Sequence, residues 1–307
     1  MKSSYSPELV PRDGNRDDFM KLLRLVAEAH LPHEWRNKML RRGLKVHEAK
    51  KGPRALTRWV DYAAQFETKR LHTATCALRE RHNLEFAICG FLPYLHEFKL
   101  RKWGNRPAQT LSIRKQKVHI FFLMFPAGYK PDAVSHNVGS EDIDHFLKHG
   151  SFLHGEAFHR GVRLLGGNRD HLLPDGFAEH GDEPHPLHPE LEETLEVHDG
   201  CAGQYAGKTN FNQTAEWRTK TGVGRAQLRL ETMRGKGACD GASNVVPSTV
   251  HSALINEQLL DPSTRELVIF MAKHRPGPSV EGTSKQGWWS ADEYVYVYYN
   301  TRLFTDG

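Results

Sequence analysis

The 307-residue sequence predicts an α/β protein, because helix-like and strand-like patterns follow one another along the chain. Around Leu22 and again around Trp59, apolar side chains recur at the three- and four-residue spacing of one helix face. From Leu84 to Cys89 and from Tyr294 to Tyr299, residue character alternates as it does in a strand. A chain that interleaves the two patterns is typical of a sheet covered by helices.

The N-terminal segment, residues 1–82, is predicted to be a basic helical region. A helix is expected to begin near Asp17, since acids at a helix N-terminus are stabilised by the helix dipole. Pro32 is expected to interrupt it. After Gly52, the spacing of apolar residues predicts a long helix that ends near Arg81.

The remaining residues, 83–307, are predicted to form a core domain of mixed sheet and helices. Its first three strands are expected at 84–89, 110–113 and 118–125, with a basic turn at 114–117. Later strands are expected at 195–198, 227–232 and 294–299. Helices are expected at 141–149, 153–165, 203–219, from 240 onward and at 262–274, and a His-rich loop at 166–190. Three strands followed by alternating helices and strands match the order of a ribonuclease H-like fold.

Charge is distributed unevenly along the chain. Residues 1–130 hold 26 Lys and Arg against 12 Asp and Glu, whereas residues 131–200 hold 4 against 15. The stretch from Arg101 to Lys130 has seven basic residues and no acid. Such asymmetry indicates a polyanionic partner, and we expect the basic half to contact DNA through its phosphates; a solvated basic face without a ligand is the alternative.

Three acids stand where a ribonuclease H-like core would bring them together. Glu85 lies in the first predicted strand, Asp199 follows a later one, and Asp240 comes just after the glycine-bracketed turn around Lys236. Clustered carboxylates repel one another unless cations lie between them, so these residues predict a site for Mg²⁺ or Mn²⁺. Taken singly, an Asp-Gly pair such as the one at Asp199 is also an ordinary turn signal.

Three blocks of sequence follow known motifs. The first, Leu84-Glu85-Phe86-Ala87-Ile88-Cys89 with residues 95–99 and Trp103, follows D-F-A-E-N, Q-D-E-x-Q and H-W. The second, residues 198–205 with Lys208 and 210–211, follows S-D-G-C-A-x-Q-[FY]-K-x-x-x-N-F. The third, residues 234–241, follows H-G-K-G-x-x-D-G. Together they resemble DDE-type transposases, in particular a multi-copy eukaryotic group of transposon-derived proteins.

The resemblance implies DNA phosphodiester cleavage or strand transfer with two Mg²⁺ or Mn²⁺ ions on a ribonuclease H-like core. The positions that correspond to the family's catalytic, metal-binding acids are Glu85, Asp199 and Asp240. The positions expected to bind phosphate are Lys208, Gly235, Lys236 and Gly237. The first block departs from the pattern, since Glu85 stands where the family has Asp and Ile88-Cys89 replace its E-N.

Two alternatives follow from these departures and from the composition. One is a transposon-derived protein that binds DNA or another partner without catalysis. The other is a zinc-dependent hydrolase built on His180, His185 and His188 of the His-rich loop. Ten of the 19 histidines fall within residues 131–200.

The sequence also bounds where the protein acts. No apolar run approaches the ~20 residues of a membrane span, so no membrane partner is expected. The four cysteines lack C-x-x-C spacing, which is typical of reduced intracellular thiols. With DNA as the expected partner, we expect a nuclear protein; assembly as a homo-oligomer stays open.

Overall fold

The structure is a computed structural model. It describes residues 16–50, 52, 54–62, 66–67, 81–99, 110–126, 132–159, 161–164, 172–179, 186–198, 207–230, 245–259, 262–275 and 293–300. The chain divides into two compact units, residues 1–46 and 47–307. Among the described helices, none combines the length and the apolar composition that crossing a membrane would require.

The described part of the first unit belongs to a single helix, α1 (Arg16–Lys50). The expected interruption at Pro32 is wrong, because α1 continues through that residue. Proline fixes φ near a helical value and removes one backbone N–H, so it weakens a helix without necessarily ending it. The Pro32 carbonyl accepts a hydrogen bond of 3.4 Å from the Arg36 guanidinium, one turn further on.

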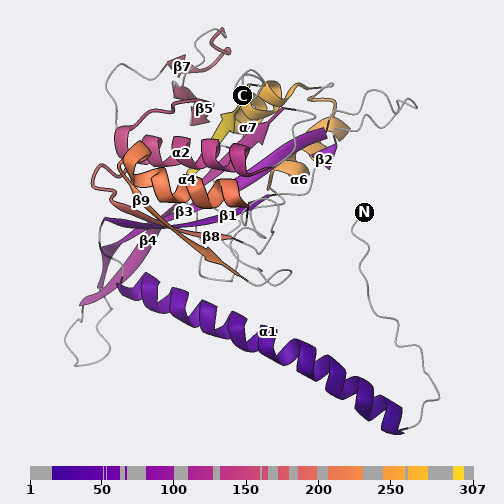
Figure 1. The fold of residues 1–307 in the computed structure, drawn as a ribbon. Helices are drawn as coiled ribbons and strands as arrows, with labels where there is room; N and C mark the ends of the chain where they lie inside the picture. Colours follow the sequence, from indigo (N-terminus) through magenta and orange to yellow (C-terminus); the bar gives the residue numbers. More distant parts are fainter. Residues whose placement is uncertain are drawn as a thin grey trace, which may run out of the picture. The chain divides into compact units, whose positions relative to one another are not determined.

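The second unit contains one large mixed sheet (Figure 1). Its strands are β1 (Ala55–Tyr62), β2 (Phe66–Glu67), β3 (Arg81–Lys99), β4 (Thr110–Phe125), β5 (Glu156–His159), β6 (Val162–Leu164), β7 (Ala178–Glu179), β8 (Glu193–His198), β9 (Gly224–Arg229) and β10 (Glu293–Tyr298). Their order across the sheet is β7-β6-β5-β10-β4-β3-β1-β8-β9, and β2 pairs with β3. The expected mixed α/β class is confirmed.

The strands on the two sides of β1 pair in different ways. Strands β1, β3 and β4 form an antiparallel meander. On its other side β1 pairs in parallel with β8, and β8 pairs in parallel with β9. Strand β10 then adds in parallel to β4, and β5 pairs antiparallel with β10.

Strand β1 overturns part of the predicted helical region. The helix expected after Gly52 is wrong over Ala55–Tyr62, which lie in the sheet. Thr57, Trp59 and Val60 are β-branched or aromatic residues that favour a strand. Pairing with β3 on one edge and β8 on the other stabilises this conformation. The boundary predicted at residue 82 falls within β3 itself, the strand that pairs with β1.

Two further elements differ from the sequence-based expectation. Residues 114–117, expected as a turn, continue strand β4, because β3 pairs with it along this length. The helix expected at 153–165 is wrong: the segment contains the antiparallel pair β5 and β6. Gly161 has a φ of 74°, in the left-handed region that glycine enters without steric cost, and this allows the chain to reverse.

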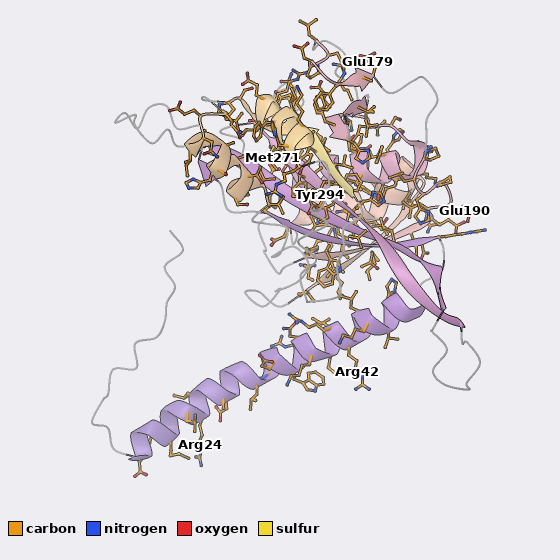
Figure 2. All side chains as sticks on the ribbon, turned by 180° about the vertical axis from the view of Figure 1, so that it is seen from behind. Arg24, Arg42, Glu179, Glu190, Met271 and Tyr294 are labelled. Carbon is orange, nitrogen blue, oxygen red and sulfur yellow. The ribbon has the colours of Figure 1, made fainter. Side chains whose placement is uncertain are left out.

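Among the described elements, four helices cover the two faces of the sheet. Helices α2 (Ala133–His149) and α4 (Lys208–Thr221) lie on one face, and α6 (Val245–Ile255) and α7 (Thr264–His274) lie on the other (Figures 1 and 2). Strand β4 shows the division, since Phe121 and Leu123 pack in the α2 cluster while Phe122 and Met124 pack with α6 and α7. Helix α4, helix α7 and strand β10 confirm the expected elements near 203–219, 262–274 and 294–299.

Candidate functional site

The predicted site residues fall into two groups. Glu85 lies on β3, where it pairs with Tyr62 of β1 and Leu123 of β4. Lys208 is the exposed first residue of α4. The other predicted positions lie outside the described residues: Asp199, Gly235, Lys236, Gly237 and Asp240.

The His-rich loop is described only in part. His180 and His185 lie outside the described residues, whereas His188 is buried. The backbone N–H of His188 donates to the carbonyl of Leu147 on α2, at 2.6 Å. Within the described part of the chain, no three His, Cys, Asp or Glu side chains gather as they would around a metal ion.

Asp61 is an acid that the sequence analysis did not select. It lies on β1, the strand between β3 and β8, and it is partly buried. Its predecessor Val60 pairs with His198, the last residue of β8. Asp199 follows His198 in the sequence and lies outside the described residues.

Asp61 of β1 and Glu85 of β3 are not cross-strand partners but lie at adjacent positions of the register. Asp61 pairs with Phe86, and Glu85 pairs with Tyr62. The Tyr62 hydroxyl lies 2.9 Å from the Ser135 hydroxyl, on the face covered by α2. Because successive side chains of a strand point to opposite faces, Asp61 is directed to the face covered by α6 and α7.

The sequence did carry a signal for this strand. Thr57, Trp59 and Val60 are β-branched or aromatic residues that favour a strand. Leu56, Thr57, Arg58 and Val60 are buried, whereas Trp59 and Asp61 are partly buried. The spacing of Leu56, Trp59 and Val60 also fits one face of a helix, and this spacing is the basis of the predicted helix. Arg58 is fully buried, which composition alone does not predict.

Cationic and aromatic side chains gather near the end of β8. Arg229, the last residue of β9, pairs with His198. Its guanidinium lies 4.7 Å from the ring centroid of Phe211, which is 49% exposed. Lys208 precedes Phe211 by one helical turn on α4. These side chains offer positive charge and a flat apolar surface at the edge where β8 ends.

A buried ionic network fixes the strands that lead to this edge. Glu196 of β8 lies 2.8 Å from the His136 imidazole on α2 and 2.5 Å from the Arg225 guanidinium on β9. Arg58 of β1 lies 3.9 Å from the same carboxylate, and all four side chains have no exposed surface. Burial alone would raise the pKa of Glu196, but Arg225, His136 and Arg58 hold that pKa well below its ordinary value.

The network continues through Asp144 of α2. Its carboxylate lies 2.8 Å from Arg58 and accepts a 2.9 Å hydrogen bond from the Trp217 indole of α4. The Arg225 guanidinium lies 4.4 Å from the centroid of the Trp217 ring. The network joins β1, β8 and β9 to α2 and α4. Because solvent does not reach it, its role is to position these elements.

A second polar cluster lies at the turn between α2 and β5. The buried Asp142 carboxylate accepts backbone hydrogen bonds from Leu153, His154 and Gly155, at 2.9, 2.9 and 2.7 Å. Burial raises the pKa of Asp142, although these N–H groups and His154 oppose the shift. Gly155 has no room for a side chain, since a Cβ there would lie 2.5 Å from Val297.

A surface hollow lies at the other end of the same strands. It is lined by Arg54, Lys148, Pro189, Glu190, Leu191 and Glu192. Arg54 and Glu192 directly precede β1 and β8, and they form an exposed ion pair of 2.7 Å. The hollow is therefore separated from Asp61 by the length of β1.

The sheet thus presents Asp61 on the strand that is flanked by β3 and β8, with cationic side chains at the end of β9 and the start of α4. Comparisons of this chain with protein-family models, with curated proteins and with solved structures found no match.

Proposed function

We propose that this chain cleaves or transfers DNA phosphodiester bonds with divalent metal ions, on a ribonuclease H-like core. The observation that carries the proposal is the strand order β4-β3-β1-β8-β9. An antiparallel meander of β1, β3 and β4 is followed by two strands parallel to β1 on its other side. Helices α2, α4 and α6 follow in the sequence positions that the expected order requires.

The same order supports Asp61 as the first acid of the site. In the meander β1 comes first and β3 second, so the first-strand position belongs to Asp61 and the second-strand position to Glu85. Asp61-Tyr62-Ala63 also begins with the Asp, aromatic and Ala order of the D-F-A-E-N motif. The proposed set of acids is therefore Asp61, Asp199 and Asp240.

The donor set suits the expected metal. Carboxylate oxygens are hard ligands, which Mg²⁺ and Mn²⁺ prefer. Asp61 is the member of the set that the structure describes, and its partial burial favours pairing with a cation over exposure to solvent. Two such ions activate an attacking oxygen and stabilise the leaving oxygen in phosphodiester chemistry. Asp61, Asp199 and Asp240 would hold them.

The cations near the end of β8 fit a DNA substrate. Lys208 and Arg229 would neutralise phosphate charge, and Phe211 offers a surface on which a base can stack. Lys236, which stands between two glycines and four residues before Asp240 in the sequence, would add a further cation. Each phosphate contact would steepen the salt dependence of binding.

The test compares Asp61→Asn with Glu85→Gln, each of which removes one carboxylate charge from adjacent strands. Nicking of supercoiled plasmid is measured with Mn²⁺, and DNA binding is measured separately by fluorescence anisotropy. Because a metal site supplies several kcal/mol to the transition state, Asp61→Asn should lower the nicking rate by at least about 100-fold with binding retained.

The control variant Glu85→Gln should keep most of the nicking activity. Loss of activity with Glu85→Gln, but not with Asp61→Asn, would return the first-acid role to Glu85. A wild-type chain that binds DNA but does not nick it in Mn²⁺ would contradict the enzymatic proposal. It would favour the alternative of a transposon-derived protein that binds DNA without catalysis.

A further inference from the structure

Two imidazoles lie side by side near the C-terminal end of α2. His145 and His149 are four residues apart, and their ring centroids are separated by 4.7 Å at an interplanar angle of 44°. His145 is partly buried and His149 is exposed. Residues at this spacing are neighbours on one helix face, so both rings are accessible from the same side.

The helix end fixes the tautomer of His145. Its Nδ1 lies 2.7 Å from the carbonyl oxygen of Ser151, an acceptor, so Nδ1 carries the proton. Gly150, at φ 80°, caps α2, and its backbone N–H donates a 2.8 Å hydrogen bond to the carbonyl of Phe146. This turn places the Ser151 carbonyl against the His145 ring. With Nδ1 protonated, Nε2 of the neutral ring keeps a free lone pair. Metal-binding histidines typically have this arrangement, in which the second nitrogen donates to a carbonyl.

The nearest cation in the sequence is directed elsewhere. The Lys148 ammonium donates to the carbonyl of Gly222, at 3.0 Å, beyond the C-terminus of α4.

The ring separation fits two ligands of one metal ion. A metal–nitrogen bond of about 2.05 Å puts the ion about 3.2 Å from each ring centroid. Two centroids 4.7 Å apart then subtend an angle of about 95° at the ion, which lies between the roughly 90° of cis ligands in an octahedral centre and the roughly 109° of a tetrahedral zinc centre. Imidazole nitrogens select ions such as Zn²⁺, Ni²⁺ and Cu²⁺ over Mg²⁺.

We propose that His145 and His149 chelate a borderline transition-metal ion, Zn²⁺ in the first instance, on the outer face of α2. Solvent completes the coordination, since the described residues supply no third ligand. This site is distinct from the carboxylate site proposed for DNA chemistry, from which it differs in ligand type, and from the His-rich loop. It does not depend on the proposed function.

The test titrates the untagged 307-residue chain with Zn²⁺ at pH 7.5 in competition with a chromophoric chelator. The variants are His149→Ala and His145→Ala, with His251→Ala on α6 as the control. His251 is exposed, and the positions four residues before and after it are Pro247 and Ile255. It therefore has no second histidine at the spacing that pairs His145 with His149. His149→Ala keeps the His145–Ser151 bond, so it tests the chelate without disturbing the helix end.

The wild-type chain and His251→Ala should each bind one Zn²⁺ with the same affinity. His149→Ala and His145→Ala should bind this ion at least about tenfold more weakly. Equal affinity and stoichiometry in the wild-type chain and His149→Ala would overturn the proposal. So would a site that survives both α2 variants and disappears in a His180→Ala, His185→Ala double variant, because the zinc would then belong to the His-rich loop.

Discussion

Helix α2 is attached to the sheet by two kinds of chemistry. Over β4 and β10 the contact is apolar, with Ile143 and Phe146 packed among Phe121, Leu123 and Val295. Over β1, β8 and β9 it is ionic, through the network centred on Glu196. Apolar packing responds to volume, whereas a buried ion pair responds to charge. The apolar half of this contact, over β4 and β10, and its ionic half, over β1, β8 and β9, therefore differ in which substitutions they tolerate.

The largest effect is expected where charge is removed without a change of shape. Glu196→Gln is nearly isosteric, but it leaves Arg225, His136 and Arg58 without their carboxylate in an environment that excludes water. Removing one member of a buried ion pair costs about 3–5 kcal/mol of unfolding free energy. Urea denaturation followed by far-UV circular dichroism would measure this loss.

Glu193→Gln is the matched control, on the same strand with the same change. The Glu193 side chain is 70% exposed, and its ion pair with Arg218 spans 3.7 Å. Exposed pairs of this kind contribute at most about 1 kcal/mol. A Glu196→Gln protein as stable as Glu193→Gln would show that the ionic half contributes nothing specific to the fold.

A smaller effect is expected for an isosteric change in the apolar half. Leu123 is 1% exposed and packs in the cluster beneath α2. Leu123→Met conserves volume and apolar character, so it should cost less than about 1.5 kcal/mol in the same urea assay. If it cost as much as Glu196→Gln, shape rather than charge would govern both halves, and the contrast between them would fail.

The same contrast explains which parts of the fold were predictable. Strand β10 and helix α7 follow clear hydrophobic patterns, and both elements were predicted. Strand β1 carries Arg58 at a fully buried position, because Asp144 and Glu196 neutralise it from other elements. Long-range charge pairing of this kind leaves no local pattern. A helix was therefore predicted where β1 lies, and Asp61 was not among the predicted site residues.

The candidate site shows a related limit. Motif spacing selected Asp199, Asp240 and the turn around Lys236, which lie outside the described residues and stay predictions. Motif matching also favoured Glu85, since it lies in an evident strand. Strand order, which a single sequence does not reveal, identifies β1 as the first strand of the meander.

The smallest predicted effect concerns the pH dependence of stability at the edge of the ionic half. The buried Glu141 carboxylate lies 2.5 Å from the Lys220 ammonium and 3.7 Å from the His154 imidazole. Interaction with Glu141 raises the pKa of His154 above its ordinary value of 6.5, against the opposing effects of burial and Lys220, and Asp142 adds to the increase. Burial would raise the pKa of Glu141, but His154 and Lys220 lower it below its ordinary value of 4.5.

The signs define a pH window. Because the folded pKa of His154 is raised, its contribution to stability is complete below pH 6.5 and is lost as pH rises through the folded pKa. The folded pKa of Glu141 is lowered, so its contribution is complete above pH 4.5 and is lost in more acidic solution. The stability advantage of the wild-type chain over His154→Gln should therefore be greatest between these values and shrink by pH 8.5, in urea titrations at each pH. An advantage that grows with rising pH would contradict the pairing, because a neutral imidazole would then be the stabilising form.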